Sequence, residues 1–278
     1  MKPNIKKNDL LKIIAMVTML VDHMGVLYFP EYQIFRTIGR IAFPIFAFYL
    51  AMGYAFTSSK KKYALRLFIF GVVSQIPYMF LNYNIEAHLL GYNVILLFTY
   101  ALGMLFVFDQ LSESIKKKKY FFSVLYFIGL IFIIFFLEFL EVKYYGFYLS
   151  YGSYGLVLIL LFYKLINKPI ILIASFIVIS FAFAYLQGVS ILYEYYHYPY
   201  FDALFNFKLT WISIIEYKNG LSTLQGYFFQ SRSIMGVLLI IILNKININV
   251  RINKYIAYYF YPIHIALLVL IKLAMTRL

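Results

Sequence analysis

The first long apolar segment of the chain runs from Leu10 to Phe29 and reads LLKIIAMVTMLVDHMGVLYF. A membrane-spanning helix needs about 20 mainly apolar residues, so this segment is long enough to cross a bilayer. Asp22 and His23 lie inside it. An ionisable side chain at the centre of a membrane helix costs about 2.5–3.5 kcal/mol, and such residues usually face the protein interior and serve a function. The segment therefore predicts a membrane protein with buried chemistry.

The rest of the 278-residue chain is similarly apolar, because 64% of its residues are hydrophobic and 13% are charged. The mean hydropathy is +0.81. These values are typical of a chain that crosses a membrane several times, and they exclude an ordinary soluble globule. The absence of cysteine excludes disulfides, thiolate metal sites and a cysteine nucleophile. With four histidines and no HExxH motif, we expect no metal site.

Apolar segments of membrane-spanning length recur along the chain. They cover residues 10–29, 34–57, 63–82, 92–111, 120–140, 147–165, 168–187, 221–243 and 254–273. We interpret 188–220, with its aromatic run from Tyr193 to Tyr200, as an external loop with an interfacial segment or as a tenth, short helix. The first segment lacks a small-residue cleavage site, so we expect an uncleaved span and not a signal peptide. The predicted fold class is all-α, a polytopic membrane helix bundle of about nine to ten transmembrane helices in a single domain, 1–278.

Basic and acidic residues alternate along these segments. Lysine and arginine gather before the first span and at every second connection, in runs such as Lys60–Lys62 and Lys116–Lys119, whereas most acids lie in the other connections. By the positive-inside rule, the N-terminus is cytoplasmic. The net charge of +14 then reflects topology, because basic runs separated by membrane spans cannot form one nucleic-acid groove. The abundance of Lys, Asn, Ile, Tyr and Phe is typical of AT-rich bacterial genomes, so we expect a multi-pass protein of a bacterial cytoplasmic membrane.

This orientation places polar residues of several spans at one depth. At about 1.5 Å per helical residue, Asp22 lies roughly 18 Å from the cytoplasmic start of its helix, in the outer half of the membrane. Arg36 and Arg40 enter the second span from outside and share one helix face, because they are four residues apart. The other polar residues near this depth are Gln75, Thr99 and His264. We therefore predict a polar layer formed by several helices in the outer half of the membrane.

Each of these residues also has a purely structural interpretation. Asp22 could form a buried ion pair with Arg40 that only fixes helix packing. His23 could be a satisfied core histidine, and it cannot face Asp22 because adjacent helical residues diverge by about 100°. Gln75 and Thr99 could form hydrogen bonds between helices. Arg36 could simply extend its charged end to the membrane interface. His264 could pack beside Pro262.

The basic residues at the start of the third span have two interpretations. As topology signals, they contact anionic lipids. As a binding site, they hold the phosphates of a cytoplasmic nucleotide-like cofactor. The residues concerned are Lys60, Lys61, Lys62 and Arg66.

Several motifs resemble those of the TraX family of membrane proteins. The similar segments are Leu11–Gly25, which contains Asp22-His23; Arg36–Phe48, which reads RxxGRxAFPxF; Lys62–Leu67; Ser74–Pro77; Asn93 with Thr99 and Gly103; and Phe260–His264, which contains YPxH. The resemblance covers the first hundred residues closely and is weak over 112–220. Where the family often has an acid before a Tyr-Gly step, this chain has Ser150.

The TraX family is known for N-terminal acetylation of conjugative pilin, so the resemblance implies an acetyltransferase that uses acetyl-CoA as donor. It implies that acetyl-CoA binds at Lys60, Lys61, Lys62, Arg66, Gln75, Asn93 and Thr99. We expect His23 or His264 to be the general base, with Asp22 in support. Arg36 and Arg40 would stabilise the oxyanion or position the acceptor.

Two other functions stay open. In a proton-coupled secondary transporter, the same Asp, His and Arg side chains form a proton relay. In a noncatalytic membrane assembly factor, they only fix helix packing. The expected partners are membrane lipid, acetyl-CoA, and a secreted peptide or cell-envelope glycan as acceptor, without nucleic acid.

Overall fold

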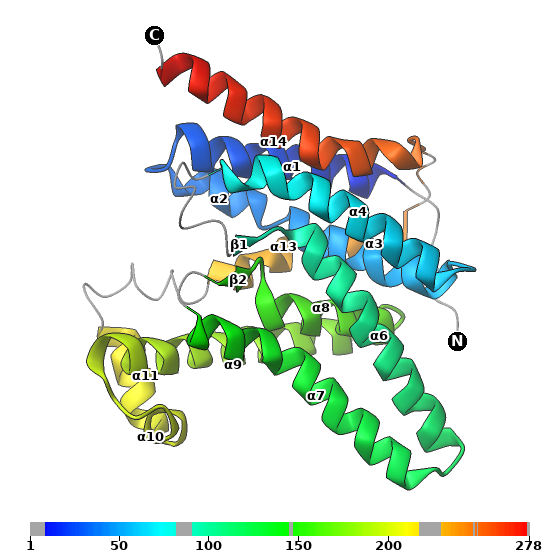
Figure 1. Cartoon of the computed structure of the whole chain (residues 1–278), viewed down its shortest axis with the longest axis vertical. Helices are drawn as coiled ribbons and strands as arrows, with labels where there is room; N and C mark the ends of the chain where they lie inside the picture. The colour runs from blue at the N-terminus through cyan, green and yellow to red at the C-terminus, as the bar shows by residue number, and fades with distance from the viewer. Residues whose placement is uncertain are drawn as a thin grey trace.

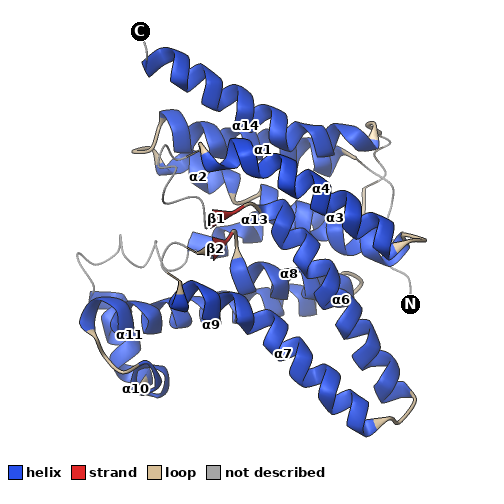
Figure 2. Cartoon of the chain, viewed as in Figure 1, coloured by secondary structure: helices blue, strands red, loops and turns tan. Residues whose placement is uncertain are grey.

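The computed structural model describes residues 9–81, 91–144, 147–216, 229–246, 248 and 250–276 (Figure 1). Nearly all of this chain is helical, which confirms the all-α prediction (Figure 2). The longer helices are α1 (Leu10–Tyr28), α3 (Ala42–Phe56), α4 (Lys60–Met79), α6 (Val94–Lys116), α7 (Tyr120–Lys143), α8 (Gly152–Leu165), α9 (Pro169–Tyr196) and α14 (Lys254–Thr276). The shorter elements are α2 (Gln33–Gly39), β1 (Gly91–Tyr92), β2 (Tyr148–Leu149), α10 (Tyr200–Phe205), α11 (Phe207–Glu216), the 3-10 helix η1 (Phe229–Ser233) and α13 (Ile234–Leu243).

Six helices within the described ranges are long and apolar enough to cross a membrane. They cover Leu10–Tyr28, Gln33–Phe56, Val94–Lys116, Tyr120–Glu141, Pro169–Ser190 and Tyr255–Met275. Two shorter apolar helices, Gly152–Leu165 and Gln230–Leu243, coincide with two further predicted segments. The predicted span 63–82 corresponds to α4, which is less apolar than the six. The count of nine to ten spans stays a prediction, and residues 217–228 of the eighth segment and its flank lie outside the described part of the chain.

The predicted second span, 34–57, is divided into α2 and α3 at Arg40 and Ile41. Two local features explain this division. Pro44 has no N–H to donate to the carbonyl of Arg40, so one helical hydrogen bond is missing at this point. In addition, Asp22 of α1 presses against Gly39, where any Cβ would collide with the aspartate side chain. The chain therefore bends beside Asp22, and the Arg40 side chain is buried there.

The segment predicted as an external aromatic loop is largely helical. Helix α9 extends to Tyr196, so the loop prediction is wrong for Tyr193–Tyr196. The sequence has no proline or glycine between Val189 and Tyr198, so nothing stops the helix earlier. It ends at His197, which takes a left-handed conformation with φ 54° just before Pro199. Helices α10 and α11 then pack against α9 and form a small apolar cluster with it.

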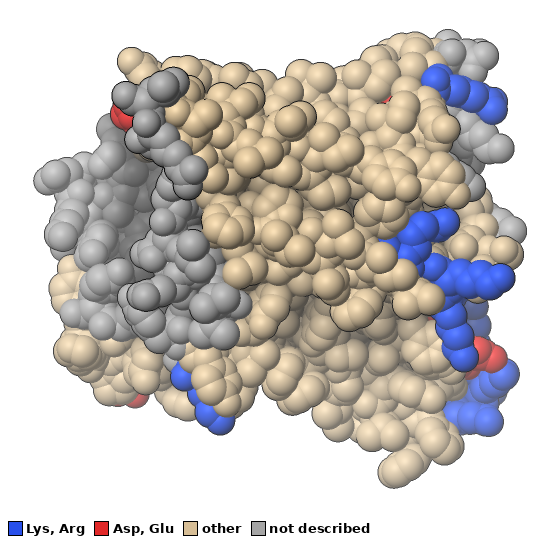
Figure 3. Space-filling view, turned by 45° about the horizontal axis from the view of Figure 1, so that its top comes forward, with Lys and Arg blue, Asp and Glu red and all other residues tan. Residues whose placement is uncertain are grey.

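One apolar core extends through the bundle, from Leu11 on α1 to Val269 on α14. Helix α7 is the least buried of the six long apolar helices, and its Phe121 and Phe132 are 77% and 61% exposed. Figure 3 shows a broad face nearly free of charged side chains, with most of the visible lysine and arginine side chains gathered toward one edge. An exposed apolar surface of this extent is typical of contact with membrane lipid.

A short parallel sheet links two distant parts of the chain. Gly91 pairs with Tyr148, and Tyr92 pairs with Leu149. The N–H of Ser150 donates to the carbonyl of Tyr92 at 3.0 Å. Non-helical backbone at membrane depth is tolerated only where protein surrounds it or where it lines a cavity. Here it leads directly into residues that line an internal cavity.

Candidate functional site

Asp22 lies between two arginines. Its Oδ2 is 2.7 Å from Nη1 of Arg36, and its Oδ1 is 3.7 Å from Nη2 of Arg40. The side chains of Asp22 and Arg40 are 10% and 6% exposed, whereas that of Arg36 is 36% exposed. Arg40 also donates to Oε1 of Gln230 at 3.3 Å. The pairing of Asp22 with Arg40 is therefore confirmed, and Arg36 is the closer partner.

Two glycines allow α1 and α2 to approach closely around this ion pair. A Cβ at Gly39 would collide with Asp22, and a Cβ at Gly25 would collide with Phe35. Glycine removes the side chain that would otherwise hold the two helices apart. The short distance between Asp22 and Arg36 thus depends on the absence of a methyl group at Gly39.

His23 points to a different partner, His264 of α14. Nδ1 of His23 lies 2.7 Å from Nε2 of His264, and the two ring planes are within 6° of parallel. Both side chains are buried. The sequence marks each histidine as a candidate base, but it does not predict that they touch. Among the described hydrogen bonds, none joins Asp22 to either histidine ring. The partners of Asp22 are Arg36 and Arg40.

The partners of the two rings define where their protons lie. Nδ1 of His264 is 2.6 Å from the backbone carbonyl of Phe260, and a carbonyl only accepts, so this nitrogen carries a proton. With both rings neutral, Nε2 of His264 is an acceptor, and Nδ1 of His23 must donate to it. Nε2 of His23 then holds a lone pair. A base arranged in this way takes up a proton while its neighbours fix the orientation of the ring.

A cavity of 300 Å³, here called the polar chamber, is lined by Asp22, His23, Arg36 and Arg40. Three hydroxyl groups belong to the same lining: the Tyr78 hydroxyl lies 2.9 Å from Oγ of Ser150 and 3.3 Å from the Tyr148 hydroxyl. Tyr151 also lines the chamber, and its ring centroid is 5.3 Å from the guanidinium carbon of Arg40. The chamber therefore combines an ion-pair cluster, a buried histidine and a group of hydroxyls.

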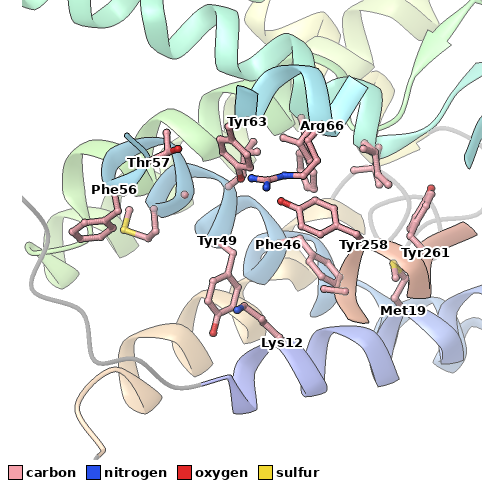
Figure 4. Close-up of a pocket in the computed structure, with 18 residues that line it drawn as sticks. Lys12, Met19, Phe46, Tyr49, Phe56, Thr57, Tyr63, Arg66, Tyr258 and Tyr261 are labelled. Carbon is pink, nitrogen blue, oxygen red and sulfur yellow. The ribbon is translucent and has the colours of Figure 1, made fainter. Parts of the chain in front are cut away.

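A second cavity of 420 Å³, here called the larger cavity, has mostly aromatic and aliphatic walls (Figure 4). Its basic residues are Lys12 and Arg66. The Arg66 guanidinium carbon lies 5.6 and 5.4 Å from the ring centroids of Tyr63 and Tyr258, and Figure 4 shows it between the two rings. Five residues line both cavities: Met19, Phe46, Val94, Phe98 and Tyr261. The two cavities are therefore neighbours with a shared wall.

The lysine run at the start of α4 contributes no side chain to the lining of the larger cavity. Lys60 is 2.7 Å from Oδ2 of Asp109, and the Asp109 carboxylate also accepts hydrogen bonds from Tyr54 at 3.0 Å and Tyr163 at 2.7 Å. Lys61 and Lys62 are exposed, and neither lines the larger cavity. Among the four basic residues predicted to hold phosphates, Arg66 is the one that the structure places in the lining of that cavity.

The three polar residues predicted along the cofactor have partners within the fold. Gln75 donates to the carbonyl of Gly91 at 2.6 Å and accepts from Nδ2 of Asn93 at 2.8 Å. Oδ1 of Asn93 accepts from the N–H of Ile95 and so caps the start of α6. Thr99 donates to the carbonyl of Ile95 at 3.1 Å. None of the three predicted residues lines either cavity. Gln75 and Asn93 link α4 to the start of α6, whereas Thr99 bonds within α6 itself.

Several residues that line or adjoin the two cavities were not predicted from the sequence. Asp109 carries the same signal as Asp22, an acid within an apolar helix, but it lies close to the lysines at the helix end. Lys12 is hidden among the basic residues that set topology. Tyr78 and Tyr258 have no distinguishing signal, because the chain contains 29 tyrosines.

Metal ligation finds no support in the described part of the chain, where no group of three or more His, Cys, Asp or Glu side chains is placed to hold an ion.

The structure is that of a multi-pass membrane protein with a polar chamber. Its apolar helices expose an apolar surface suited to lipid, and its ionisable residues gather in buried clusters. A model of the TraX protein family matches residues 7–272, nearly the whole chain. The chain therefore belongs to the TraX family, which confirms the resemblance.

Two curated relatives match shorter stretches. The "Uncharacterized protein RP591" of Rickettsia prowazekii (strain Madrid E) is 46% identical over 68 residues, which cover 24% of this chain and 25% of the relative. The "Probable fimbrial assembly protein FimC, serogroup H1" of Dichelobacter nodosus is 35% identical over 69 residues, which cover 23% of this chain and 28% of the relative. The chain thus spans about a quarter of the length of the curated relatives it matches. No solved structure matches the chain.

Proposed function

We propose that the protein is an integral-membrane acetyltransferase that moves an acetyl group from cytoplasmic acetyl-CoA to an amine or hydroxyl acceptor in the outer half of the membrane. In the proposed topology of nine to ten spans, the N-terminus and the lysine runs are cytoplasmic, as the positive-inside rule requires. The membrane is the bacterial cytoplasmic membrane. Lys12 and Arg66 then face the donor side, and the polar chamber faces the acceptor side.

The observation that carries this proposal is the wall shared by the two cavities. A donor with an anionic end and a long, thin arm needs basic residues at one end of its site and an apolar passage to the reacting group. The larger cavity has Lys12 and Arg66 together with apolar walls, and it adjoins the chamber that contains His23. A small displacement of shared side chains such as Phe46 or Tyr261 would join the two spaces.

Donor binding is assigned to the larger cavity. Arg66 is preorganised between two tyrosine rings, and a guanidinium is suited to binding phosphate oxygens. The exposed Lys61 and Lys62 add positive charge near the same end of α4. Gln75, Asn93 and Thr99 stabilise the surrounding helices and are not assigned to the donor.

The chemistry is assigned to Nε2 of His23. This nitrogen takes a proton from the acceptor as the acceptor attacks the thioester carbonyl carbon. The new C–N or C–O bond forms, the C–S bond breaks, and the proton passes from His23 to the leaving thiolate. The same lone pair also serves a two-step route, in which Nε2 first receives the acetyl group and then transfers it to the acceptor.

Arg40 and Arg36 are assigned to the tetrahedral oxyanion and to the acceptor. A buried guanidinium stabilises negative charge more strongly than the same group does in water. Asp22 holds both arginines in place, which makes it a positioning residue in this proposal. His264 holds the His23 ring through Nδ1 and is likewise a positioning residue.

The test is acetyl transfer by the purified full chain in lipid nanodiscs supplied with acetyl-CoA that is radiolabelled in the acetyl group. We expect labelled product or slow acetyl-CoA hydrolysis, and loss of roughly 10²–10⁴-fold activity in His23→Ala. Label retained on wild-type protein but not on His23→Ala would identify the two-step route. Activity that is unchanged in His23→Ala would overturn the assignment of the base, and ion flux without acetyl-CoA binding would favour a secondary transporter.

A second candidate, a noncatalytic membrane assembly factor, is favoured by the name of one relative, a probable fimbrial assembly protein. In that case the ion pair only fixes packing. A double variant, Asp22→Asn with Arg40→Gln, that restores pilus-type assembly in cells without any acetyl transfer would favour this candidate over the enzyme.

A further inference from the structure

Helices α10 and α11 form a short hairpin that folds back along α9 (Figure 1). Tyr200, at the start of α10, has its ring centroid 6.0 Å from that of Tyr193, near the end of α9. Phe207, at the start of α11, stacks instead on Tyr185, with 4.6 Å between the ring centroids. Tyr185 precedes Tyr193 in the same helix by about 12 Å, at 1.5 Å per residue. The chain therefore turns back beside α9 by roughly two helical turns.

The contacts with α9 set the depth of this hairpin. Residues Pro169–Ser190 of α9 are one of the six segments that are long and apolar enough to cross a membrane. Phe181 and Tyr185 lie about 18 and 24 Å along this helix from Pro169, and the hydrocarbon core of a bilayer is about 30 Å thick. Both rings contact Trp211 of α11, with 6.5 and 5.9 Å between centroids. Trp211 therefore lies at the depth of the leaflet that is farther from Pro169.

Side chains satisfy the backbone at the joint between the two helices. The Tyr185 hydroxyl lies 3.3 Å from the carbonyl oxygen of Ala203 and 2.8 Å from that of Leu204. Thr210, which is fully buried, also donates to the Ala203 carbonyl, at 2.7 Å. Oδ1 of Asn206 accepts from a backbone N–H in the first turn of α11, at 3.1 Å. Non-helical backbone at membrane depth must find such partners within the protein, because no water is available to it.

The exposed side of the hairpin is aromatic. Phe201, Phe205 and Phe207 are 71%, 77% and 63% exposed. Phe181, which contacts Trp211, is itself 53% exposed on the apolar surface of α9. The aromatic side of the hairpin thus continues the surface that α9 presents to lipid, and an exposed apolar surface of this kind fits acyl chains.

The charged residues of the hairpin limit how deep it can lie. Asp202 and Lys208 are both exposed. Asp202 closely follows Tyr200, which lies beside the end of α9, and a lysine can extend its amine to the headgroups. Aromatic residues with charged neighbours are typical of the membrane–water interface, where an apolar helix face is buried by about 5–10 Å. These residues place the hairpin at the boundary between headgroups and acyl chains, and not at the membrane centre.

We propose that α10 and α11 re-enter the membrane from the outer side and bind the acyl chains of outer-leaflet lipids through Phe201, Phe205 and Phe207. The outer side is the one that the positive-inside rule assigns, opposite Lys168. The hairpin is then neither an aqueous loop nor a full span. This inference goes beyond the proposed acetyltransferase function and does not depend on it, because none of the three phenylalanines lines either cavity.

The test uses single cysteine sites, because the chain contains no cysteine of its own. Phe205→Cys is labelled with a nitroxide in the full chain, in nanodiscs of phosphatidylcholine and phosphatidylglycerol. Electron paramagnetic resonance then measures how often the label collides with oxygen, which concentrates in lipid, and with a nickel chelate, which stays in water. Phe132→Cys on α7 and Glu31→Cys after α1 are the matched reference sites, since all three positions are exposed.

We expect the label at position 205 to lie about 5–10 Å below the headgroups, between the depths of the labels at 132 and 31. A collision rate with the nickel chelate as high as at position 31 would show an aqueous loop and overturn the proposal. Low collision rates with both reagents would show that protein, such as a second copy of this chain, covers the aromatic side. That result would overturn the proposal as well.

Trp211 provides a second measurement without any substitution, because it is the single tryptophan of the chain. Brominated phosphatidylcholine in the nanodisc should quench its fluorescence strongly, whereas iodide in the water should quench it weakly. The reverse order would contradict insertion of α11. Neither measurement requires acetyl transfer, so failure of the proposed function and failure of this inference give different results.

Discussion

The polar chamber and the larger cavity share a wall but are built from different interactions. The chamber depends on an ion-pair cluster and a histidine pair, in which Asp22, His23, Arg40 and His264 are buried and Arg36 is partly exposed. The larger cavity depends on aromatic packing. Arg66 contacts tyrosine rings, and Lys12 contacts Tyr49 and also pairs with Asp9 at 2.6 Å. Buried charges are strongly coupled to their partners, whereas a cation on an aromatic ring keeps much of its capacity to bind an anion. Substitutions in the chamber should therefore affect stability, and substitutions in the larger cavity should mainly affect binding.

The largest effect is expected for Asp22→Asn. This change leaves two adjacent guanidiniums without a carboxylate, and breaking a buried pair costs about 3–5 kcal/mol. Equilibrium unfolding in detergent measures the loss. Adding Arg40→Gln should recover part of the stability, because it removes one of the two unpaired charges. A single variant as stable as the wild type would show that the chamber is more hydrated than the closely packed ion pair indicates.

A smaller loss is expected for Gly39→Ala. The new Cβ would collide with Asp22 and force α1 and α2 apart, and overpacking of this kind costs about 1–3 kcal/mol. Gly103→Ala on α6 is the matched control, since nothing lies within 4 Å of the Cβ it adds. That control should be neutral or slightly stabilising, because alanine favours a helix over glycine. Equal unfolding midpoints for the two variants would contradict the close contact.

Arg66→Gln probes the larger cavity. We expect the KM for acetyl-CoA to rise about tenfold with little change in kcat, because a ground-state charge–phosphate contact is lost. The unfolding midpoint should stay near that of the wild type. A fall in kcat with unchanged KM would place Arg66 in the reaction and not in donor binding.

The smallest effect is expected for Asp109→Asn. Asp109 pairs with Lys60, whose side chain is 45% exposed, and partly exposed pairs contribute about 0.2–1 kcal/mol. Thermal unfolding compared with Glu113→Gln, which removes an acid from an exposed pair on the same helix, tests this estimate. If Asp109→Asn loses more stability than the control by over about 1 kcal/mol, the hydrogen bonds from Tyr54 and Tyr163 also contribute to stability.

Much of the helical framework could be predicted from the sequence, because membrane spans are apolar and loop charges alternate. The ion pair of Asp22 and Arg40 was also predictable, since a buried acid needs a cation at similar depth. The contact of His23 with His264 was not predictable, because it depends on how α1 packs against α14 across 241 residues. The helical state of Tyr193–Tyr196 was missed because an aromatic run near a proline is compatible with either a loop or a helix end.

The sequence separation of the two histidines also affects the order in which the site forms during synthesis. At synthesis rates of about 5–20 residues per second, His264 leaves the ribosome roughly 12–50 s after His23, since 241 residues separate them. During this interval, Asp22 and Arg36 can already meet, because only 14 residues separate them. The charged half of the chamber thus forms early, within the first helices to insert. The ring that orients His23 arrives with the last described helix, so a nascent chain carries the ion pair well before it can carry the complete histidine pair.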